Sequence, residues 1–200
     1  MNLKLRHFLS HIDGPLIAEW VLDDDYSTFF RNCMFLPSFA DCMNYEQWSQ
    51  NLVMMVQDEN GQTIGMVTGY HANFKGRTIK SGGLIDKRFR CSGHAYNAQV
   101  AWIDHLFKRR GIRKVVVEIV DEYLFNPFVR MGFKEEGRFK DEHEINGKFV
   151  DEIRMGCFRE DFKLVYKNSV RDKERMECLE AAKAAAKVDL VATTPSTLAS

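Results

Sequence analysis

The sequence predicts an α/β fold built on a mixed, mostly antiparallel sheet, with a helical extension at its C-terminal end. Three patterns lead to this prediction. Residues 51–86 alternate strand-like runs with short turns, which is typical of an antiparallel meander. Residues 78–120 contain a strand, a loop, an amphipathic helix and a strand, the order of a right-handed βαβ unit with two parallel strands. Residues 133–144 and 148–158 are rich in strand formers and flank an Asn-Gly turn, which predicts a hairpin.

The N-terminal part contains one strand and several short helices. Residues 3–9 alternate apolar and polar side chains, the period of a half-buried strand. Residues 13–32 have a helical pattern that we expect to break at the consecutive aspartates 23–25, which fit a solvated helix end or loop better than a metal site. Another short helix is expected over residues 42–50, with Asn44 as its N-cap.

The βαβ unit begins with residues 78–86, which are also the third strand of the meander. The pair Gly82-Gly83 weakens the interior of this strand, and glycines there often mark a bulge or a close approach of a ligand. The amphipathic helix that follows ends before Gly111, and residues 115–120 form a strongly apolar β run.

Composition limits the class of protein and its partners. The chain has 200 residues, of which 45% are hydrophobic, so it can bury a substantial core. The 28 Lys and Arg residues balance 28 Asp and Glu, so no bulk charge directs the protein to nucleic acid or a membrane surface. Five cysteines without a C-x-x-C pair argue against a disulfide framework or a zinc site. With no signal peptide and no membrane-spanning run, we expect a cytoplasmic protein.

A change in composition divides the chain near residue 165. We expect residues 1–165 to form the main domain, and residues 166–200 to form a helical extension with a disordered tail. The extension is rich in alanine and charge, and Ser169 is its candidate N-cap. Its thin apolar stripe could mediate contact with a second copy or with another protein.

The junction between the first parallel strand and the helix is a candidate phosphate-binding loop. The first amides of a helix point outward and the helix dipole adds positive charge, so this position favours an anion. Gly93 allows close approach of the backbone, Ala95 is too small to block it, and Arg90 adds charge nearby. On these residues alone, a tight turn with solvated arginines explains the stretch equally well. The loop comprises Arg90, Cys91, Ser92, Gly93, His94 and Ala95.

Further motifs follow this loop in a fixed order. The loop reads Arg-x-x-Gly-x-Ala over residues 90–95, residues 132–138 read Gly-Phe-Lys-Glu-Glu-Gly-Arg, and residues 146–151 read Asn-Gly-Lys-Phe-Val-Asp. The ordered set resembles the GNAT superfamily of acyl-CoA-dependent N-acetyltransferases. It looks most like the branch that acetylates N-terminal alanine or serine of ribosomal proteins. The resemblance covers roughly residues 3–162 and does not include the C-terminal extension.

This resemblance implies acetyl-CoA as cosubstrate, held between two splayed parallel strands. The pantetheine arm would pair with the first of these strands near Leu84 and Ile85, and that strand would bend away at Gly82-Gly83. The pyrophosphate would lie on the amides of residues 91–95. No metal is expected. The implied cofactor-binding residues are Leu84, Ile85, Arg90, Cys91, Ser92, Gly93, His94, Ala95, Asp121 and Phe128.

The sequence departs from the family after the second parallel strand. Family members often carry a tyrosine four residues before the Gly-Phe pair, where it protonates the leaving thiolate, and here that residue is Phe128. The asparagine commonly found seven residues before the tyrosine is replaced by Asp121, and the segment is about two residues shorter. A phenyl ring can pack against CoA but cannot donate a proton. Either water or another group protonates the thiolate, or the site binds its ligand with little catalysis.

Glu118 is the first candidate for the catalytic base, because it is the lone charge inside a strongly apolar strand. It could instead face a solvated sheet surface opposite a lysine or arginine. His71 and Glu46 are weaker candidates. Cys91 at a helix N-terminus resembles a nucleophile, but the family reaction is direct transfer.

The function expected from these observations is transfer of an acetyl group from acetyl-CoA to a primary amine, on either a protein N-terminus or a small molecule. The alternative is a weakly active or inactive GNAT-fold protein with a binding or structural role, such as a phage or assembly component. Several acidic residues could receive a cationic amine or could be ordinary surface charge: Asp23, Asp24, Asp25, Asp41, Glu142 and Glu144.

Overall fold

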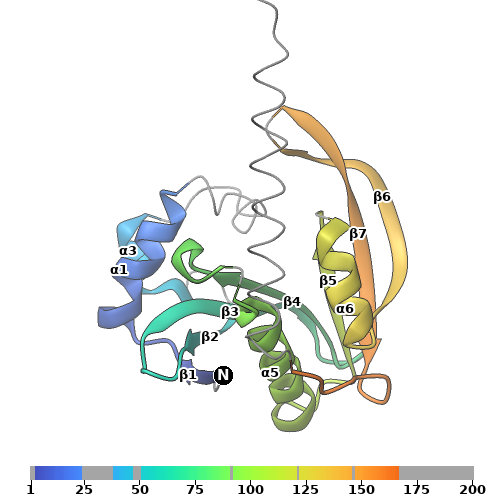
Figure 1. The fold of residues 1–200 in the computed structure, drawn as a ribbon, viewed down its shortest axis with the longest axis horizontal. Coiled ribbons are helices and arrows are strands. Elements are labelled where there is room, and N and C mark those ends of the chain that lie inside the picture. Colours follow the sequence, from blue (N-terminus) through green and yellow to red (C-terminus); the bar gives the residue numbers. More distant parts are fainter. Residues whose placement is uncertain are drawn as a thin grey trace, which may run out of the picture.

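Seven strands form one sheet in the order β1-β2-β3-β4-β5-β7-β6 (Figure 1). The computed structural model describes residues 3–23, 38–46, 51–90, 92–120, 122–145 and 147–166. The predictions for the C-terminal extension, for the loop residue Cys91, for Asp121 and for Asp24 and Asp25 lie outside these residues. Within them, no helix is both long enough and apolar enough to cross a membrane.

The strand pairings confirm the predicted α/β class with a mostly antiparallel sheet. Each neighbouring pair is antiparallel except β4 and β5, which run parallel and are joined through helix α5. The strands are β1 (Lys4–His7), β2 (Leu52–Gln57), β3 (Thr63–Asn73), β4 (Thr78–Ile85), β5 (Lys114–Ile119), β6 (Lys134–Ile145) and β7 (Lys148–Phe158). The helices are α1 (Ser10–Val21), α3 (Phe39–Met43), α5 (His94–Arg109) and α6 (Phe125–Arg130), with 3-10 turns η2 (Lys87–Phe89) and η3 (Glu122–Leu124).

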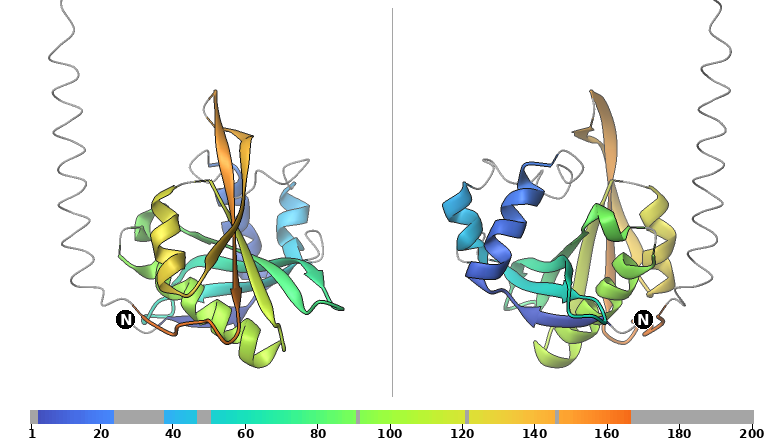
Figure 2. Two further views of the ribbon diagram at one scale, coloured as in Figure 1. Left: turned by 90° about the vertical axis from the view of Figure 1, so that its right-hand side faces the viewer. Right: turned by 60° about the vertical axis from the view of Figure 1, so that its left-hand side comes forward.

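The two faces of the sheet are covered by different helices. Figure 2 shows α1 and α3 on one side and α5 and α6 on the other. Side chains alternate between these faces along each strand. On β4, for example, Leu84 packs in the apolar cluster with α1, whereas Ile79 and Ile85 pack in the cluster with α5. Both faces therefore have a buried core, and the alternation assigns each strand residue to one of them.

One predicted helix start is wrong by three residues. We expected helix from residue 13, but α1 begins at Ser10, because the buried carboxylate of Asp13 accepts the Leu9 N–H at 2.7 Å from inside the first turn. The helix expected over residues 42–50 extends beyond the described residues; within them, Asn44 follows α3, which Ser38 starts with a capping box, and residues 45–46 directly after Asn44 are helical.

The parallel strands β4 and β5 pair over only three residues each. Thr78, Ile79 and Lys80 of β4 pair with residues 114–116 of β5, and beyond them β4 is paired only with β3. Figure 1 shows β4 running toward α1 while β5 runs beside β7. The expected splay of the two parallel strands is therefore present in the fold.

The glycine pair in β4 does not form the expected bulge. Pairing with β3 continues in regular register through Gly82 and Gly83, and the one shift between these strands lies between Tyr70 and Asn73. Gly83 instead makes room for a side chain of α5, because a Cβ at this position would collide with the amide of Gln99. The predicted bulge was wrong, and the group that approaches this pair is a side chain of α5 rather than the ligand that the sequence suggested.

Candidate functional site

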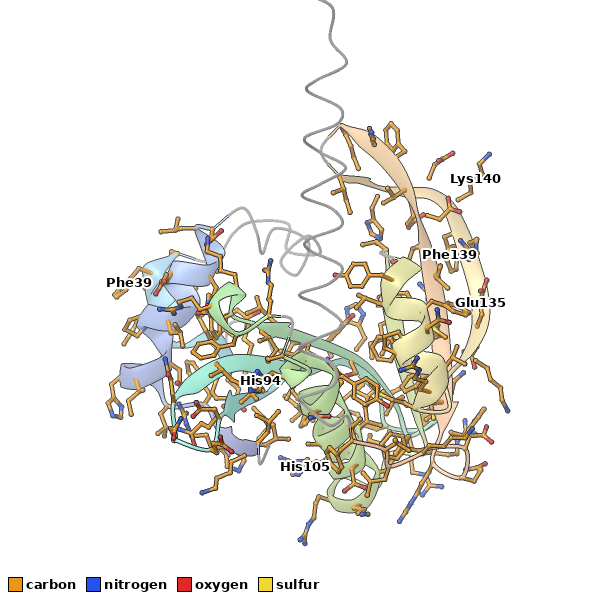
Figure 3. The ribbon with its side chains drawn as sticks, in the orientation of Figure 1. Phe39, His94, His105, Glu135, Phe139 and Lys140 are labelled. Carbon is orange, nitrogen blue, oxygen red and sulfur yellow. The ribbon has the colours of Figure 1, made fainter. Side chains whose placement is uncertain are left out.

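The candidate phosphate-binding loop leads directly into helix α5. Gly93 is the N-cap and has a φ of 78°, in the left-handed region that glycine adopts without strain. It supplies no side chain to cap the helix, so the first-turn amides lack that internal acceptor. The Ser92 hydroxyl donates to the Phe89 carbonyl at 2.7 Å and contacts His94 Nδ1. Figure 3 shows His94 at the start of α5, between the α1–α3 pair and the β6–β7 hairpin.

A buried carboxylate holds the chain between β4 and this loop. The Asp86 side chain accepts the Arg88 backbone N–H at 2.9 Å and both ends of the Arg88 guanidinium, at 2.9 and 2.6 Å. It also accepts the indole N–H of Trp20 in α1 at 3.1 Å. Lys87 adds a 2.6 Å ion pair with Asp23, just after α1. The end of α1 and the start of the loop are therefore joined by several polar contacts.

The exposed backbone edge of β4 lies beside this loop. Leu84 and Ile85, the two predicted pantetheine contacts, belong to the part of β4 that has left β5. Their side chains are buried on opposite faces of the sheet. The edge of β4 that faces β5 therefore carries backbone N–H and C=O groups that form no hydrogen bonds with β5 beyond Lys80. Such groups can pair with a ligand that carries amides.

Glu118 lies where β4 and β5 separate. Its side chain is only 4% exposed, and its Oε1 atom is 2.5 Å from Lys80 Nζ and 2.8 Å from Arg154 Nη2. Lys80 is the last β4 residue paired with β5, and Glu118 follows the last paired residue of β5 by two positions. The carboxylate is therefore buried, as a catalytic group would be. It lies opposite a lysine and an arginine, as the alternative interpretation expected, but not on the solvated surface that this interpretation also assumed.

The charged cluster continues from Glu118 toward the hairpin. Arg154 Nη2 also contacts Glu152 Oε1 at 3.1 Å, and Glu152 Oε2 is 2.9 Å from His143 Nε2. Burial acts to raise the pKa of Glu152, but the hydrogen bonds and charges of His143 and Arg154 outweigh it and lower the pKa overall. We call Lys80, Glu118, Arg154, Glu152 and His143 the charged row.

Phe128 is part of the apolar core. It is 8% exposed and packs edge-to-face on Phe133, with ring centroids 5.2 Å apart. It lies on α6, four residues before Gly132, as the sequence indicated. The Phe128 ring can therefore make apolar contacts, but it has no hydroxyl that could protonate a leaving thiolate.

The structure brings some predicted residues together and separates others. Gly93, His94 and Ala95 gather at the start of α5, and Glu118 lies at the splay. The weaker candidates His71 and Glu46 are both exposed, and neither belongs to the charged row. Two of the acidic residues considered for an amine are engaged elsewhere, since Asp23 pairs with Lys87 and Asp41 caps α3. No three potential metal ligands cluster among the described residues.

Sequence reasoning missed four members of the charged row: Lys80, Arg154, Glu152 and His143. Lys80 lies 38 positions from Glu118 in the chain, and the register that sets Arg154 opposite Glu118 depends on the pairing of β5 with β7. The alternation of Glu152 and Arg154 on one strand was the only local signal. This alternation places the Glu152 and Arg154 side chains on the same face of the sheet, but it does not indicate which side chains of other strands they contact.

The fold is similar to that of the spermidine N-acetyltransferase from Vibrio cholerae. Its complex with CoA and spermine has a TM-score of 0.72 at 20% identity, covering 80% of this chain and 96% of that one. A dodecameric structure of the Vibrio cholerae enzyme in an intermediate state has a TM-score of 0.66 at 20% identity, covering 79% and 94%. A chimera of the Vibrio cholerae enzyme with hSSAT has a TM-score of 0.69 at 20% identity, covering 80% and 97%.

No protein-family model and no curated protein matches the sequence. These three solved structures are of a spermidine enzyme, so they agree with the fold that the resemblance implied and give no support to its ribosomal-protein branch. At this level of identity the likeness concerns the architecture. The splayed parallel strands, the loop at the start of α5 and the order of the sheet are together the fold of the GNAT N-acetyltransferases.

Proposed function

We propose that this protein transfers an acetyl group from acetyl-CoA to a small primary amine. The observation that carries the proposal is the separation of β4 from β5 directly beside the start of α5. This arrangement offers an unpaired backbone edge to the amides of pantetheine and a helix N-terminus to the pyrophosphate. Two adjacent features thereby match the pantetheine arm and the pyrophosphate of a long, flexible, polyanionic cosubstrate.

The donor would be held mainly by backbone. The pantetheine arm runs along β4 at Leu84 and Ile85, and the pyrophosphate lies on amides of residues 92–95 at the start of α5. Gly93 keeps a side chain away from the phosphates, and Ala95 is small and exposed. Arg90, exposed on the same loop, adds positive charge near the nucleotide.

The reaction would be a direct transfer. The acceptor ammonium first loses a proton, so that its nitrogen can attack the thioester carbon. The new C–N bond forms and the C–S bond breaks, with sulfur keeping the electron pair. The nitrogen then loses a second proton to solvent water, and solvent water returns one to the CoA thiolate, because Phe128 has none to give. One proton is released per turnover, and Glu118 is the buried carboxylate placed to accept it at the splay.

The acceptor class is the finer part of the proposal. Spermine and spermidine are named for the similar Vibrio cholerae structures, so polyamines are the first acceptors to test. A protein N-terminus is the second, from the sequence resemblance to the ribosomal-protein branch.

Thiol release with acetyl-CoA and a panel of amines tests this function. The panel contains spermidine, spermine, a monoamine and peptides with free N-terminal alanine or serine, and mass spectrometry identifies the acetylated product. We expect amine-dependent thiol release with at least one small amine, and a matching loss in Glu118→Gln. Absence of turnover across the panel would contradict the enzyme assignment.

The alternative is a protein that binds acyl-CoA without turnover. Two observations favour it: Phe128 is a buried core residue without a hydroxyl, and Glu118 Oε1 is already contacted by two cations. This alternative predicts that acetyl-CoA raises the melting temperature while no amine accelerates thiol release.

A further inference from the structure

An irregularity in the β6–β7 hairpin places His143 on the charged row. Phe139 pairs with Glu152, but His143 pairs with Val150, so β6 carries two more residues than β7 between these pairs. The extra length is held by Asp141, whose φ is 54° and whose N–H donates to Asp151 Oδ1 at 3.0 Å. Such insertions re-aim side chains. Regular pairing would have put His143 two positions further out, away from Glu152.

Arg154 is shared between the two carboxylates of the row by a single nitrogen. Nη2 contacts Glu118 at 2.8 Å and Glu152 at 3.1 Å, while the Nε atom is buried and has no acceptor among the described residues. Arginine prefers to bind one carboxylate through two parallel hydrogen bonds. Here, instead, the Nη2 atom of Arg154 contacts two different carboxylates, and the Nε–H donor of the same guanidinium has no acceptor among the described residues.

The surroundings of Arg154 limit how it can move. Its guanidinium lies over the ring of Phe139 on β6, 4.5 Å from the centroid, which keeps it on this face of the sheet (Figure 3 labels Phe139). Among the described residues, the charged partner of His143 is Glu152, and Arg154, Glu118 and Lys80 follow along the row. The row balances two carboxylates against a lysine and an arginine, and the charge of His143, its fifth member, depends on whether the imidazole ring carries one proton or two.

We propose that His143 is a positioning residue that controls how Arg154 divides between Glu152 and Glu118. When His143 is protonated, it neutralises Glu152 and Arg154 shifts to Glu118, using Nε as well as Nη2. The carboxylate of Glu118 is then occupied and accepts the proton of the amine poorly. When His143 is neutral, Glu152 retains Arg154 and Glu118 is more available. This inference rests on the proposed acetyl transfer, and it adds that protonation of His143 at low pH lowers the rate of that reaction.

The pH dependence of kcat/KM tests the proposal in two variants that fix the charge. In His143→Gln the site stays neutral, so the ratio of kcat/KM at about pH 8 to that at about pH 6 should fall by about threefold or more relative to the wild type. In His143→Lys the site stays positive, so kcat/KM should be low at both pH values. His11→Gln, at an exposed position on α1, is the matched control and should reproduce the wild-type profile. Profiles of His143→Gln that superimpose on the wild type overturn the proposal.

A measurement on the wild-type protein needs neither a variant nor turnover. In an NMR titration, the Arg154 Nε–H signal should move with the same midpoint as the His143 ring, because Nε gains an acceptor when the ring is protonated. A signal that does not follow the ring overturns the proposal. If the two signals move together but no amine is acetylated, the linkage stands and the proposed function fails. If acetylation is found with an unchanged profile, the inference alone fails.

Discussion

Replacing Asp86 with Asn tests whether the link between α1 and the phosphate-binding loop stabilises the fold. The hydrogen bond from Arg88 is the main cause that lowers the pKa of Asp86 from 3.8 to about 2, against the opposing effect of burial. That difference corresponds to roughly 2.5 kcal/mol of native-state stability above pH 3.8. Arg88 is 56% exposed, so solvent screening reduces the expected loss in the variant to about 1.5 kcal/mol.

The sign of the pH effect follows from the direction of the shift. Because the folded pKa of Asp86 lies below the unfolded value, its contribution is complete above pH 3.8 and is lost as pH falls toward about 2. Urea unfolding of Asp86→Asn and wild type should therefore differ by about 1.5 kcal/mol near pH 7, by roughly half of that near pH 3 and by much less near pH 2. Glu19→Gln, an exposed carboxylate 3.9 Å from Arg88, is the control and should change stability by under about 0.5 kcal/mol. An equally small change in Asp86→Asn at neutral pH would refute the reasoning.

Two further predictions concern the core. Gly132→Ala should lower the free energy of unfolding, measured with denaturant, by well over the loss of about 1 kcal/mol expected for Gly111→Ala. Both glycines have a positive φ, but only at Gly132 would the new Cβ collide with the Asp161 carbonyl. Equal losses in the two variants would disprove the collision. His105→Phe should make unfolding less acid-sensitive below about pH 6.5, because burial and nearby Arg110, Arg109 and His7 lower the pKa of His105, so neutral His105 contributes stability that is lost on acidification. An unchanged pH slope would disprove this role.

Local patterns were sufficient to predict most strands and the parallel pair. The alternation in residues 3–9, the apolar run in residues 51–57, the amphipathic helix and the apolar run after it indicated these elements, whereas the position of β7 between β5 and β6 was not predicted. Gly93 marked the loop because a left-handed N-cap before a helix favours glycine.

The partners of Glu118 could not be predicted in the same way. They depend on registers between distant strands and on the irregularity at Asp141, which no local pattern encodes. Gly82-Gly83 misled for a related reason. Two adjacent glycines in a strand are typical of a bulge, but here the strand is regular, and a glycine is needed at position 83 because the Gln99 side chain of α5 occupies the space of a Cβ.

Affinity for acetyl-CoA at the start of α5 is the central claim, and Ala95 allows a matched test. Ala95 is exposed at the second position of α5, where a glutamate suits the helix dipole and so should not weaken the fold. Isothermal titration should show that wild type binds acetyl-CoA, that Ala95→Gln changes Kd by less than about threefold, and that Ala95→Glu raises Kd by at least about tenfold through repulsion of the pyrophosphate. Equal Kd values for the Gln and Glu variants, or no binding to the wild type, would contradict the account.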